Sequence, residues 1–512
     1  MFLNRTSARA LLSRRVQGVG IRRDFRTSCR VYGSETTATT PSGPAKPSGW
    51  SQQGVWAVAL GAGALGWGLA SFRGDNDTKG SFWDRSTASH YATLSEMEKA
   101  VKQIENETGV EGIISTDPED LLAHGYSEWS TVNPDTLPVA VAYPRTTEQV
   151  SAIARICHEN RIPIIPYSGG SSLEGNFSAP YGGVSVDFAY MDKIIQFNKD
   201  DMDIVVQPSI GWQDLNAKLL QMDSGLFFPV DPATLKLAVI PEEYSVAVVT
   251  FPTIRDAAAA AAGVMQTGIP VAAMEIMDEV QMKVINLGGA TKPRIWKEEP
   301  TLFFKFSGTK EGVKDNINRV KKIAAGNKGG NFEFARDAAE QQLLWSARKE
   351  SLWSMLSLRR SGDDVWSTDV AVPFSRLADI IEVSKKEMDD LGLFASILGH
   401  VGDGNFHESI MYNKEVPGER AKVEACVKNM VKRALDMDGT CTGEHSIGWG
   451  KKESLLWEVG PETLAVMAAV KKALDPRWVM NPGKIIDVPW ENTAYPGADR
   501  AVTPNRVVKN LV

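Results

Sequence analysis

The alternation of apolar and polar positions predicts helices and short strands in turn from Thr136 onward. In "TTEQVSAIARICHEN" (146–160) the apolar residues repeat with helical spacing, and a threonine is available as the N-cap. That face and cap consist of Val150, Ile153, Ala154, Cys157 and either Thr146 or Thr147. "RIPIIPYSGGSSLEG" then predicts a strand and a glycine-rich turn, and "GGVSVDF", "KIIQF" and "DIVVQP" predict strands before the helix "WQDLNAKLLQ". We expect an α+β unit with much of its sheet antiparallel.

A second α+β unit is predicted to begin near Tyr244. Four segments have strand character: "YSVAVVTF", "VAAMEIMD", "TLFFKFSG" (301–308) and "NFEFAR". Between them lie the helical patterns "TIRDAAAAAAGVMQTG", which ends at Gly268, and "KEGVKDNINRVKKIAAGN". Two successive β-α-β units of this size predict a ferredoxin-like sheet with its helices on one side. Residues 417–487 are predicted to be largely helical.

The first 49 residues differ in composition from the rest of the chain. Eight arginines lie among Ser, Thr and Leu, and Asp24 is the only acidic residue before Glu35. This composition is typical of a mitochondrial presequence, and a linker rich in Ser, Thr, Gly and Pro follows it. A disordered basic arm is the alternative interpretation.

An apolar segment follows the linker. "GVWAVALGAGALGWGLASF" (54–72) carries no charge and approaches the roughly 20 residues that cross a bilayer core. Trp50, Trp56 and Trp67 could lie near the interfaces. We therefore expect a transmembrane segment over 50–73 that stops in the mitochondrial inner membrane, with the body facing the intermembrane space. A span removed after sorting is the alternative.

Composition narrows the class of partner. The chain is 43% apolar and 23% charged, as an ordinary globular protein is, and its net charge is −7. Nine basic and two acidic residues lie in 1–46, so the body is more acidic than the whole. An acidic body disfavours nucleic acid as a partner. The four cysteines have no paired spacing, which argues against a disulfide framework and a cysteine-based zinc site.

Three of the six histidines fall close together in the sequence, at His400, His407 and His445. In "FASILGHVGDGNFHESIMY" (394–412) two strand-like segments flank a turn signal. A hairpin folded about Asp403 and Gly404 would place His400 directly opposite His407, with their Cβ atoms about 4.5–5.5 Å apart. Such a pair could share one metal ion.

The third ligand that we expect is Glu444, in the glycine-bounded loop "CTGEHSIG". Two histidines and one carboxylate, with one position open, are typical of a catalytic metal site, and His445 would remain to move a proton. Zn²⁺, Mn²⁺ and Fe²⁺ all accept this ligand set. A hydrogen-bonded histidine pair that stabilises a hairpin is the plain alternative, and a metallohydrolase would fit the spacing equally well.

Several motifs in order resemble one flavoprotein family. They are "VAYPRTTEQVSAIARICHENRIPIIPYSGGSSLEG", "WSTDVAVPFSRL", "GHVGDGNFH", "GEHSIG" and "MNPGK". From about Thr136 to Asp487 the chain resembles the FAD-dependent D-lactate dehydrogenases of mitochondria, the cytochrome c-linked type. Their wider family includes vanillyl-alcohol oxidase and D-2-hydroxyglutarate dehydrogenase. The resemblance implies an FAD-binding domain of the p-cresol methylhydroxylase (PCMH) type and a ferredoxin-like substrate or cap domain with a helical C-terminal region.

The resemblance also implies roles for single residues. Backbone N–H groups of "PYSGGSS" would cradle the FAD pyrophosphate, where glycine permits close approach. This loop consists of Pro166, Tyr167, Ser168, Gly169, Gly170, Ser171 and Ser172. Asn481 would lie near the flavin ring, and Arg348 would clamp the substrate carboxylate. Asn405 would hydrogen-bond substrate beside the metal, and His445 would be the general base.

The implied reaction is oxidation of D-lactate, or a related D-2-hydroxy acid, with hydride passing to FAD and electrons to cytochrome c. An acidic surface would suit cytochrome c as the electron acceptor. D-2-hydroxyglutarate is the alternative substrate. A protein unable to hold FAD is a further alternative, because the sequence departs from the family at one place.

That departure lies between Pro232 and Ala233. In the resembling proteins several tens of glycine-rich residues separate "FFPVDP" from "ATLKL", and here the two segments are joined directly. The expected consequences are a missing wall of the FAD cleft and open strand edges. Ser446, where the family usually has glycine, would be strained if φ is positive there.

The predicted organisation has six segments. They are a presequence and linker (1–49), a transmembrane segment (50–73), an FAD-binding domain that lacks its second half after 232 (90–240), a substrate and metal-binding cap domain (241–470), a C-terminal flavin-contacting segment (471–487) and a tail (488–512).

Overall fold

The computed structural model describes residues 91–130, 132–229 and 237–489. The predicted presequence and apolar span therefore lie outside the described residues, as do the junction at Pro232 and nearly all of the predicted tail. Among the described residues no helix combines the length and the apolar character that crossing a membrane requires.

The first sheet of the described chain contains four strands in the order β1-β2-β4-β3. They are β1 (Ile114–Ser115), β2 (Ala140–Ala142), β3 (Ile164–Tyr167) and β4 (Val184–Asp187). β2 and β3 both pair parallel to β4, and only β1 is antiparallel. The expected antiparallel character is wrong here, because α4 (Thr147–Glu159) is a crossover that returns the chain in the same direction.

α4 forms where the apolar spacing predicted it. The side chain of Thr146 caps the helix by accepting a hydrogen bond from the N–H of Gln149. Ile153, Ile156 and Cys157 form the buried face of α4. They pack against residues of α2 (Leu94–Thr108) and of the sheet. The sequence prediction of this helix is confirmed, whereas α2 and α3 (Pro118–Gly125) were not predicted.

Residues 194–239 form a small unit with two separate two-stranded sheets. Its elements are β5 (Ile194–Asn198), β6 (Asp203–Val206), α5 (Trp212–Gln221), β7 (Leu226–Phe227) and β8 (Ala238–Val239). Among its described residues, four are buried in its core: Leu215, Leu219, Leu226 and Leu237. Several apolar side chains of the same unit are exposed, namely Ile195, Val205, Leu220 and Val239.

The second predicted unit is confirmed as a ferredoxin-like arrangement. β9 (Glu243–Thr250), α6 (Ile254–Gln266) and β10 (Ala273–Met277) form the first β-α-β unit. β11 (Thr301–Gly308), α8 (Lys310–Gly326) and β12 (Phe332–Phe334) form the second. The strands are antiparallel neighbours in the order β12-β9-β11-β10.

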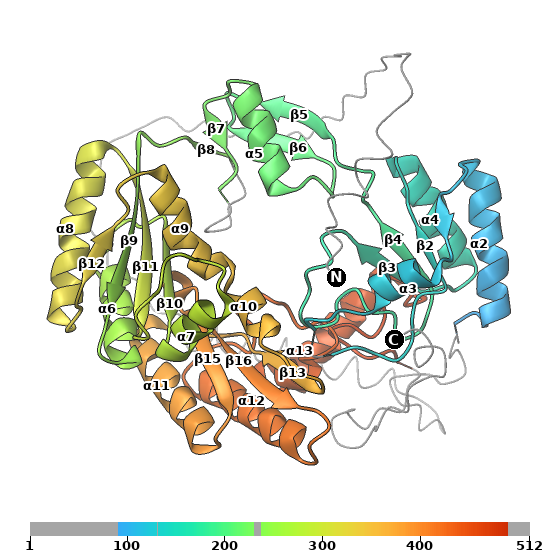
Figure 1. Cartoon of the computed structure of the whole chain (residues 1–512). Helices are drawn as coiled ribbons and strands as arrows, with labels where there is room; N and C mark the ends of the chain where they lie inside the picture. The colour runs from blue at the N-terminus through green and yellow to red at the C-terminus, as the bar shows by residue number, and fades with distance from the viewer. Residues whose placement is uncertain (1–90, 131, 230–236, 490–512) are drawn as a thin grey trace, which may run out of the picture. The chain divides into compact units, whose positions relative to one another are not determined.

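The sheet continues beyond these four strands, which the sequence did not predict. β15 (Phe394–Gly399) pairs with β10, and β16 (Asn405–Asn413) and β13 (Asp363–Ser367) follow it. The short β14 (Val370–Ala371) also pairs with β16. In Figure 1 the sheet runs from β12 to β13 through the yellow and orange part of the chain.

Helices cover both faces of this long sheet. The two helices of the β-α-β units, α6 and α8, lie on one side as predicted, and further helices cover the other side. Alternate residues of each strand face the two layers. Ala247 and Val249 pack in the core with α6, α8, α11 (Phe374–Asp390) and α12 (Glu419–Asp436). Val246 and Val248 pack on the other side with α7 (Glu279–Gly288) and α9 (Ala338–Lys349) (Figure 1). The remaining helices are α10 (Ser351–Ser357) and α13 (Lys452–Leu474), which is kinked at Gly460.

The β15–β16 hairpin is present, but its register differs from the prediction. Leu398, not His400, is opposite His407. The turn is a 3₁₀ turn over Val401–Asp403, closed by Gly404 at φ 72°. The error amounts to a shift of two residues, and because the side-chain period of a strand is two, the face is preserved. His400 and His407 are diagonal neighbours, not opposed ones.

We expect Gly404→Ala to destabilise the protein more than Gly392→Ala. Both glycines have positive φ, at 72° and 67°, so each replacement costs about 1–2 kcal/mol of backbone strain. A Cβ at Gly404 would also overlap the carbonyl oxygen of Val372, whereas nothing lies within 4 Å of a Cβ at Gly392. The overlap should add roughly 1–3 kcal/mol, measured as the free energy of unfolding in urea. Equal losses for the two variants would contradict this reading of the turn.

Candidate functional site

His400, His407 and Glu444 converge as the sequence predicted. Nε2 of His400 and Nε2 of His407 each lie 3.0 Å from Oε1 of Glu444. One ligand atom from each residue falls within 4.8 Å of the others. Glu444 reaches the pair from the loop between α12 and α13, more than thirty residues further along the chain. The spacing therefore brings two imidazoles and one carboxylate to a single point.

Both imidazoles are oriented by a second hydrogen bond on Nδ1. In His407, Nδ1 donates to the backbone oxygen of Thr368 at 2.9 Å, and the residue is only 4% exposed. In His400, Nδ1 lies 2.8 Å from Oε1 of Glu275 on β10. Such partners fix the ring and leave Nε2 directed at a metal. The donor set and its supporting contacts fit a divalent cation with a position left open for substrate.

The ionisable groups of the cluster shift one another's pKa values. Burial alone would lower the pKa of His400, but hydrogen bonds to Glu275 and Glu444 raise it to about 10. Burial lowers the pKa of His407. Burial would raise the pKa of Glu444, but hydrogen bonds from His400, His407 and His445 hold it well below its usual range. A cation would take the place of a proton shared among these groups.

Arg348, expected from the family resemblance, also lies at the site. It stands near the end of α9, where its Nε donates to Oε2 of Glu275 at 2.8 Å. One terminal nitrogen, Nη2, is 2.8 Å from Nε2 of His400. Glu275 is 3% exposed, and Arg348 and His400 hold its pKa below the usual value although burial opposes them. The carboxylate of Glu275 thus aligns the guanidinium and one imidazole together.

His445 lies against the same cluster. Its ring stacks on that of His407 with centroids 4.9 Å apart and planes at 7°. Nε2 is 3.5 Å from Oε1 of Glu444, and Nδ1 is buried without a hydrogen-bond partner among the described residues. Ser446 beside it has φ 67°, so the positive φ considered from the sequence is confirmed. His445 has an uncommitted nitrogen next to the predicted ligands.

Asn405 contacts Asp369 beside the cluster, and its amide nitrogen is already hydrogen-bonded. Its Nδ2 donates to Oδ1 of Asp369 at 2.8 Å and to the backbone oxygen of Val370 at 2.9 Å. Only Oδ1 is left, buried and without a partner among the described residues. Donation to substrate would therefore require breaking a buried hydrogen bond, and the substrate role stays a prediction.

Besides Glu275, sequence reasoning missed three charged residues around the cluster: the buried Asp369 and Glu174 and the half-buried Lys451. Nζ of Lys451 lies 3.1 Å from Oδ2 of Asp369 and 3.4 Å from Oε1 of Glu174. Burial raises the pKa of Glu174 to about 7, although Lys451 opposes the shift. The motifs "STDVAVP" and "SSLEG" contained Asp369 and Glu174, but only the tertiary structure shows that they meet.

Asn481 lies beside the loop that is predicted to hold the FAD pyrophosphate. The backbone N–H of Asn481 donates to the oxygen of Ile164 on β3 at 2.7 Å. Asn481 has φ 45°, and its Oδ1 is buried without a partner among the described residues. A cavity of 230 Å³ is lined by the residues Pro166, Tyr167, Ser168, Gly170, Ser171, Ser172, Asn176, Phe177 and Asn481.

The loop has the properties of an anion cradle. Gly170 has φ 64°, and among the described residues the N–H groups of Gly169, Gly170 and Ser171 make no backbone hydrogen bond. Backbone N–H groups without an intramolecular partner can bind phosphate oxygens. The cavity is smaller than the roughly 300–1,000 Å³ of usual ligand pockets, so these residues fit one part of a dinucleotide and not the whole.

Two family models match the chain and meet at residue 240. Residues 138–240 match the FAD binding domain, and residues 240–485 match the C-terminal domain of FAD linked oxidases. The mitochondrial D-lactate dehydrogenase [cytochrome] of Kluyveromyces lactis is 39% identical over 73% of this chain and 80% of its own length. The chain belongs to the family of the mitochondrial cytochrome-linked D-lactate dehydrogenases.

Other similar proteins agree with that membership. D-lactate dehydrogenase [cytochrome] 1 of Saccharomyces cerevisiae is 37% identical, over 72% of this chain and 76% of its own. Among solved structures, p-cresol methylhydroxylase superposes with a TM-score of 0.62 at 15% identity, over 77% of this chain and 98% of its own. Alkyldihydroxyacetonephosphate synthase gives 0.57 at 15% identity, over 75% and 84%. These superpositions establish the PCMH-type fold alone.

The alignments also contain residues of the relatives that have no counterpart here. The alignment with the Kluyveromyces lactis protein runs over 465 residues, yet it takes up only 73% of a chain of 512 residues. The number of residues of this chain that are aligned is therefore well below the 465 positions of the alignment. The same holds for the Saccharomyces cerevisiae protein, with 448 residues against 72%. Gaps on the side of this chain account for the difference.

Lys484 in "MNPGK" predicts a pH dependence of stability. It is 9% exposed, its Nζ donates to the oxygen of Ser178 at 2.6 Å, and burial lowers its pKa to about 7. Because an unfolded lysine has a pKa of about 10.4, unfolding takes up a proton between these values, and stability rises with pH across that window. Lys484 should contribute about 1.4 kcal/mol per pH unit to the free energy of unfolding between pH 8 and 9, measured in urea as the difference in slope between the wild-type protein and a variant without the amine.

The variant Lys484→Met should lack this part of the slope, because its side chain fills similar space without a proton. Lys99→Met, at an exposed position on α2, should keep it. Equal pH slopes for the wild-type protein and Lys484→Met would show that Lys484 stays charged when folded.

Proposed function

We propose that this protein oxidises D-lactate, or a related D-2-hydroxy acid, to the 2-oxo acid, with hydride transfer to FAD and electrons passed to cytochrome c. The observation that carries the proposal is the convergence of His400, His407 and Glu444 beside Arg348 and His445. These side chains can bind a 2-hydroxy carboxylate, whose hydroxyl and carboxylate lie on adjacent carbons. Family membership supports the same chemistry.

Each side chain has a task in this reaction. A divalent cation held by His400, His407 and Glu444 would act as a Lewis acid that acidifies the substrate hydroxyl. Arg348 binds the substrate carboxylate, with Glu275 fixing its guanidinium through Nε. His445 would accept the hydroxyl proton, because its ring lies beside His407 and Glu444 and its Nδ1 has no hydrogen-bond partner among the described residues. Bound FAD would accept the hydride, with the Pro166–Ser172 loop on its pyrophosphate and Asn481 near its ring.

The remaining partners and the location rest on sequence and relatives. The names of the similar dehydrogenases imply a cytochrome as acceptor and mitochondria as the site of action. The apolar segment 54–72 supports attachment to the inner membrane with the body in the intermembrane space. D-2-hydroxyglutarate is less well supported, because its second carboxylate needs a further basic group, and Arg348 is already shared with Glu275.

The metal proposal predicts that His407→Ala loses binding of added Mn²⁺ or Zn²⁺. Removing one of three ligands should weaken binding by more than the roughly 10–100-fold that the loss of an outer partner costs. His158→Ala, on α4, is the matched control and should bind as the wild-type protein does. Isothermal titration measures both.

With excess FAD, reduction of cytochrome c by D-lactate should fall with metal affinity, with L-lactate and D-2-hydroxyglutarate as substrate controls. Unchanged affinity in His407→Ala would contradict the ligand set.

A second candidate is a protein that keeps the substrate half and holds FAD weakly. It is supported by the small core of residues 194–239, by its two isolated two-stranded sheets, and by exposed apolar side chains such as Ile195 and Val239. Apolar faces of this kind usually pack against further sheet strands. Relatives contain aligned residues without counterpart here, which fits an internal segment absent between Pro232 and Ala233.

This second candidate predicts little flavin in the purified protein. We expect absorbance near 450 nm to indicate well below one FAD per chain after gel filtration, because the cradle loop alone contacts one part of the cofactor. Coding sequence found between codons 232 and 233 should restore full occupancy when it is inserted. One tightly bound FAD per chain in the protein as written would remove this candidate and favour the first.

A further inference from the structure

We propose that Asp369 is a positioning residue that holds the loop carrying Glu444 and His445 in place for metal binding. Asp369 lies between β13 and β14, two short strands that both pair with β16. Its carboxylate is 0% exposed. The proposal deepens the proposed function, because it rests on Glu444 being a metal ligand.

The carboxylate of Asp369 accepts hydrogen bonds from the backbone of that loop. Oδ2 accepts from the N–H of His445 at 3.0 Å, and the N–H of Glu444 lies 3.2 Å from both oxygens. The hydroxyl of Thr442 donates to Oδ2 at 2.7 Å. Contacts from Thr442, Glu444 and His445 therefore fix the loop at and beside the two residues whose side chains face the cluster.

Asp369 and its neighbour Thr368 are also hydrogen-bonded to β16, the strand that carries His407. The adjacent Thr368 accepts the Nδ1 hydrogen bond of His407, and its hydroxyl accepts from the N–H of Glu408 at 2.8 Å. Asn405, on the same strand, donates to Oδ1 of Asp369. One short segment, Thr368–Asp369, thus sets the distance between His407 on β16 and Glu444 on the loop.

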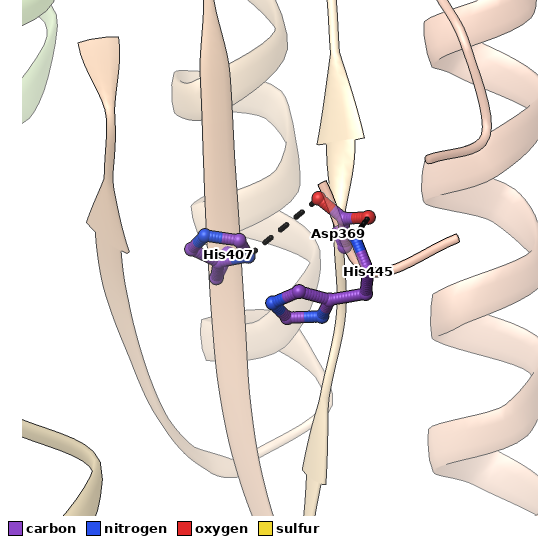
Figure 2. A group of neighbouring side chains, drawn as sticks. All are labelled: Asp369, His407 and His445. Atoms are coloured by element: carbon purple, nitrogen blue, oxygen red, sulfur yellow. Dashed lines mark hydrogen bonds and ion pairs between the residues drawn. The ribbon is translucent and has the colours of Figure 1, made fainter. Parts of the chain in front are cut away.

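Asp369, His407 and His445 also form a group with the spacing of metal ligands (Figure 2). Figure 2 shows the carboxylate of Asp369 beside the backbone of His445, with the two imidazoles stacked next to each other. We assign Asp369 no metal ligation, because both oxygens already accept hydrogen bonds from the loop and from Asn405. The ammonium of Lys451, 3.1 Å from Oδ2, would also repel a cation there.

The hydrogen-bond pattern explains why a carboxylate is needed. An asparagine at position 369 would replace one oxygen by an NH₂ group and turn a donor toward a donor. A buried donor without an acceptor costs about 1–3 kcal/mol, and moving the loop would relieve that cost. The loop would therefore shift away from His400 and His407, and Glu444 would no longer be held beside them.

The test compares Asp369→Asn with Asp278→Asn. Asp278 is a matched control, since it too is fully buried, accepts a backbone hydrogen bond from Gln281 and lies near a lysine, Lys385. It caps α7, and its contacts are with Gln281, Ile397 and Lys385, all outside the 442–451 loop. We expect Asp369→Asn to weaken Co²⁺ binding by about 10–100-fold, measured by d–d absorption, and Asp278→Asn to leave it unchanged.

Hydrogen–deuterium exchange of residues 442–451 is measured without added metal. It should accelerate in Asp369→Asn and stay at the wild-type rate in Asp278→Asn. If the wild-type protein itself takes up no Co²⁺, the proposed metal function fails, and exchange alone decides whether Asp369 holds the loop. Wild-type exchange in Asp369→Asn overturns the proposal.

A milder variant covers the case in which Asp369→Asn fails to fold. Thr442→Val removes one hydroxyl donor to Asp369 and keeps the shape of the side chain. We expect a smaller acceleration of exchange over 442–451 and a weakening of Co²⁺ binding of a few-fold, at the low end of outer-partner effects. No change in either quantity contradicts the anchoring role.

Discussion

The pairing of β16 with its neighbours is the constraint on which the candidate site depends. β15 sets the position of His400 at the turn, and β16 carries His407. β13 and β14 both pair with β16 and hold Thr368 and Asp369 between them. A slip of one residue in this ladder would turn His407 to the other face and separate it from Glu444. Strand register thus determines whether the ligands meet.

The sequence was most informative where a local pattern decides the structure. α4 and the four strands of the ferredoxin-like unit formed as predicted, because apolar spacing and a capping threonine suffice for them. The extension of the sheet by β15, β16 and β13 was not predictable, because strand neighbours distant in sequence leave no local signal. The register of the hairpin was missed for a similar reason, since a 3₁₀ turn replaced the expected tight turn.

The residues of the candidate site fall into the same two groups: those that a local sequence pattern predicts and those that it does not. His400, His407 and Glu444 could be predicted because metal-ligand chemistry is confined to few residue types. Glu275, Asp369, Glu174 and Lys451 could not, because a buried carboxylate or lysine has no distinctive spacing and reads as an ordinary charged residue until the fold is known. The residues that orient the ligands are thus the ones that sequence reasoning misses.

The two halves of the proposed machinery differ in completeness. On the substrate side both histidines have a second hydrogen-bond partner that orients the ring, and the core around them is large. On the flavin side one loop and Asn481 form a small cavity, and the neighbouring unit 194–239 is built from two short hairpins around four buried leucines. The substrate half could therefore bind metal independently of flavin.

The central claim is that one divalent cation is held by His400, His407 and Glu444. X-ray absorption at the metal edge of protein loaded with one equivalent of Zn²⁺ tests it most directly. The account predicts a first shell of nitrogen and oxygen at about 2.0–2.2 Å, with outer-shell scattering from two imidazoles. A shell of oxygen alone without imidazole scattering, or one containing sulfur, would contradict it.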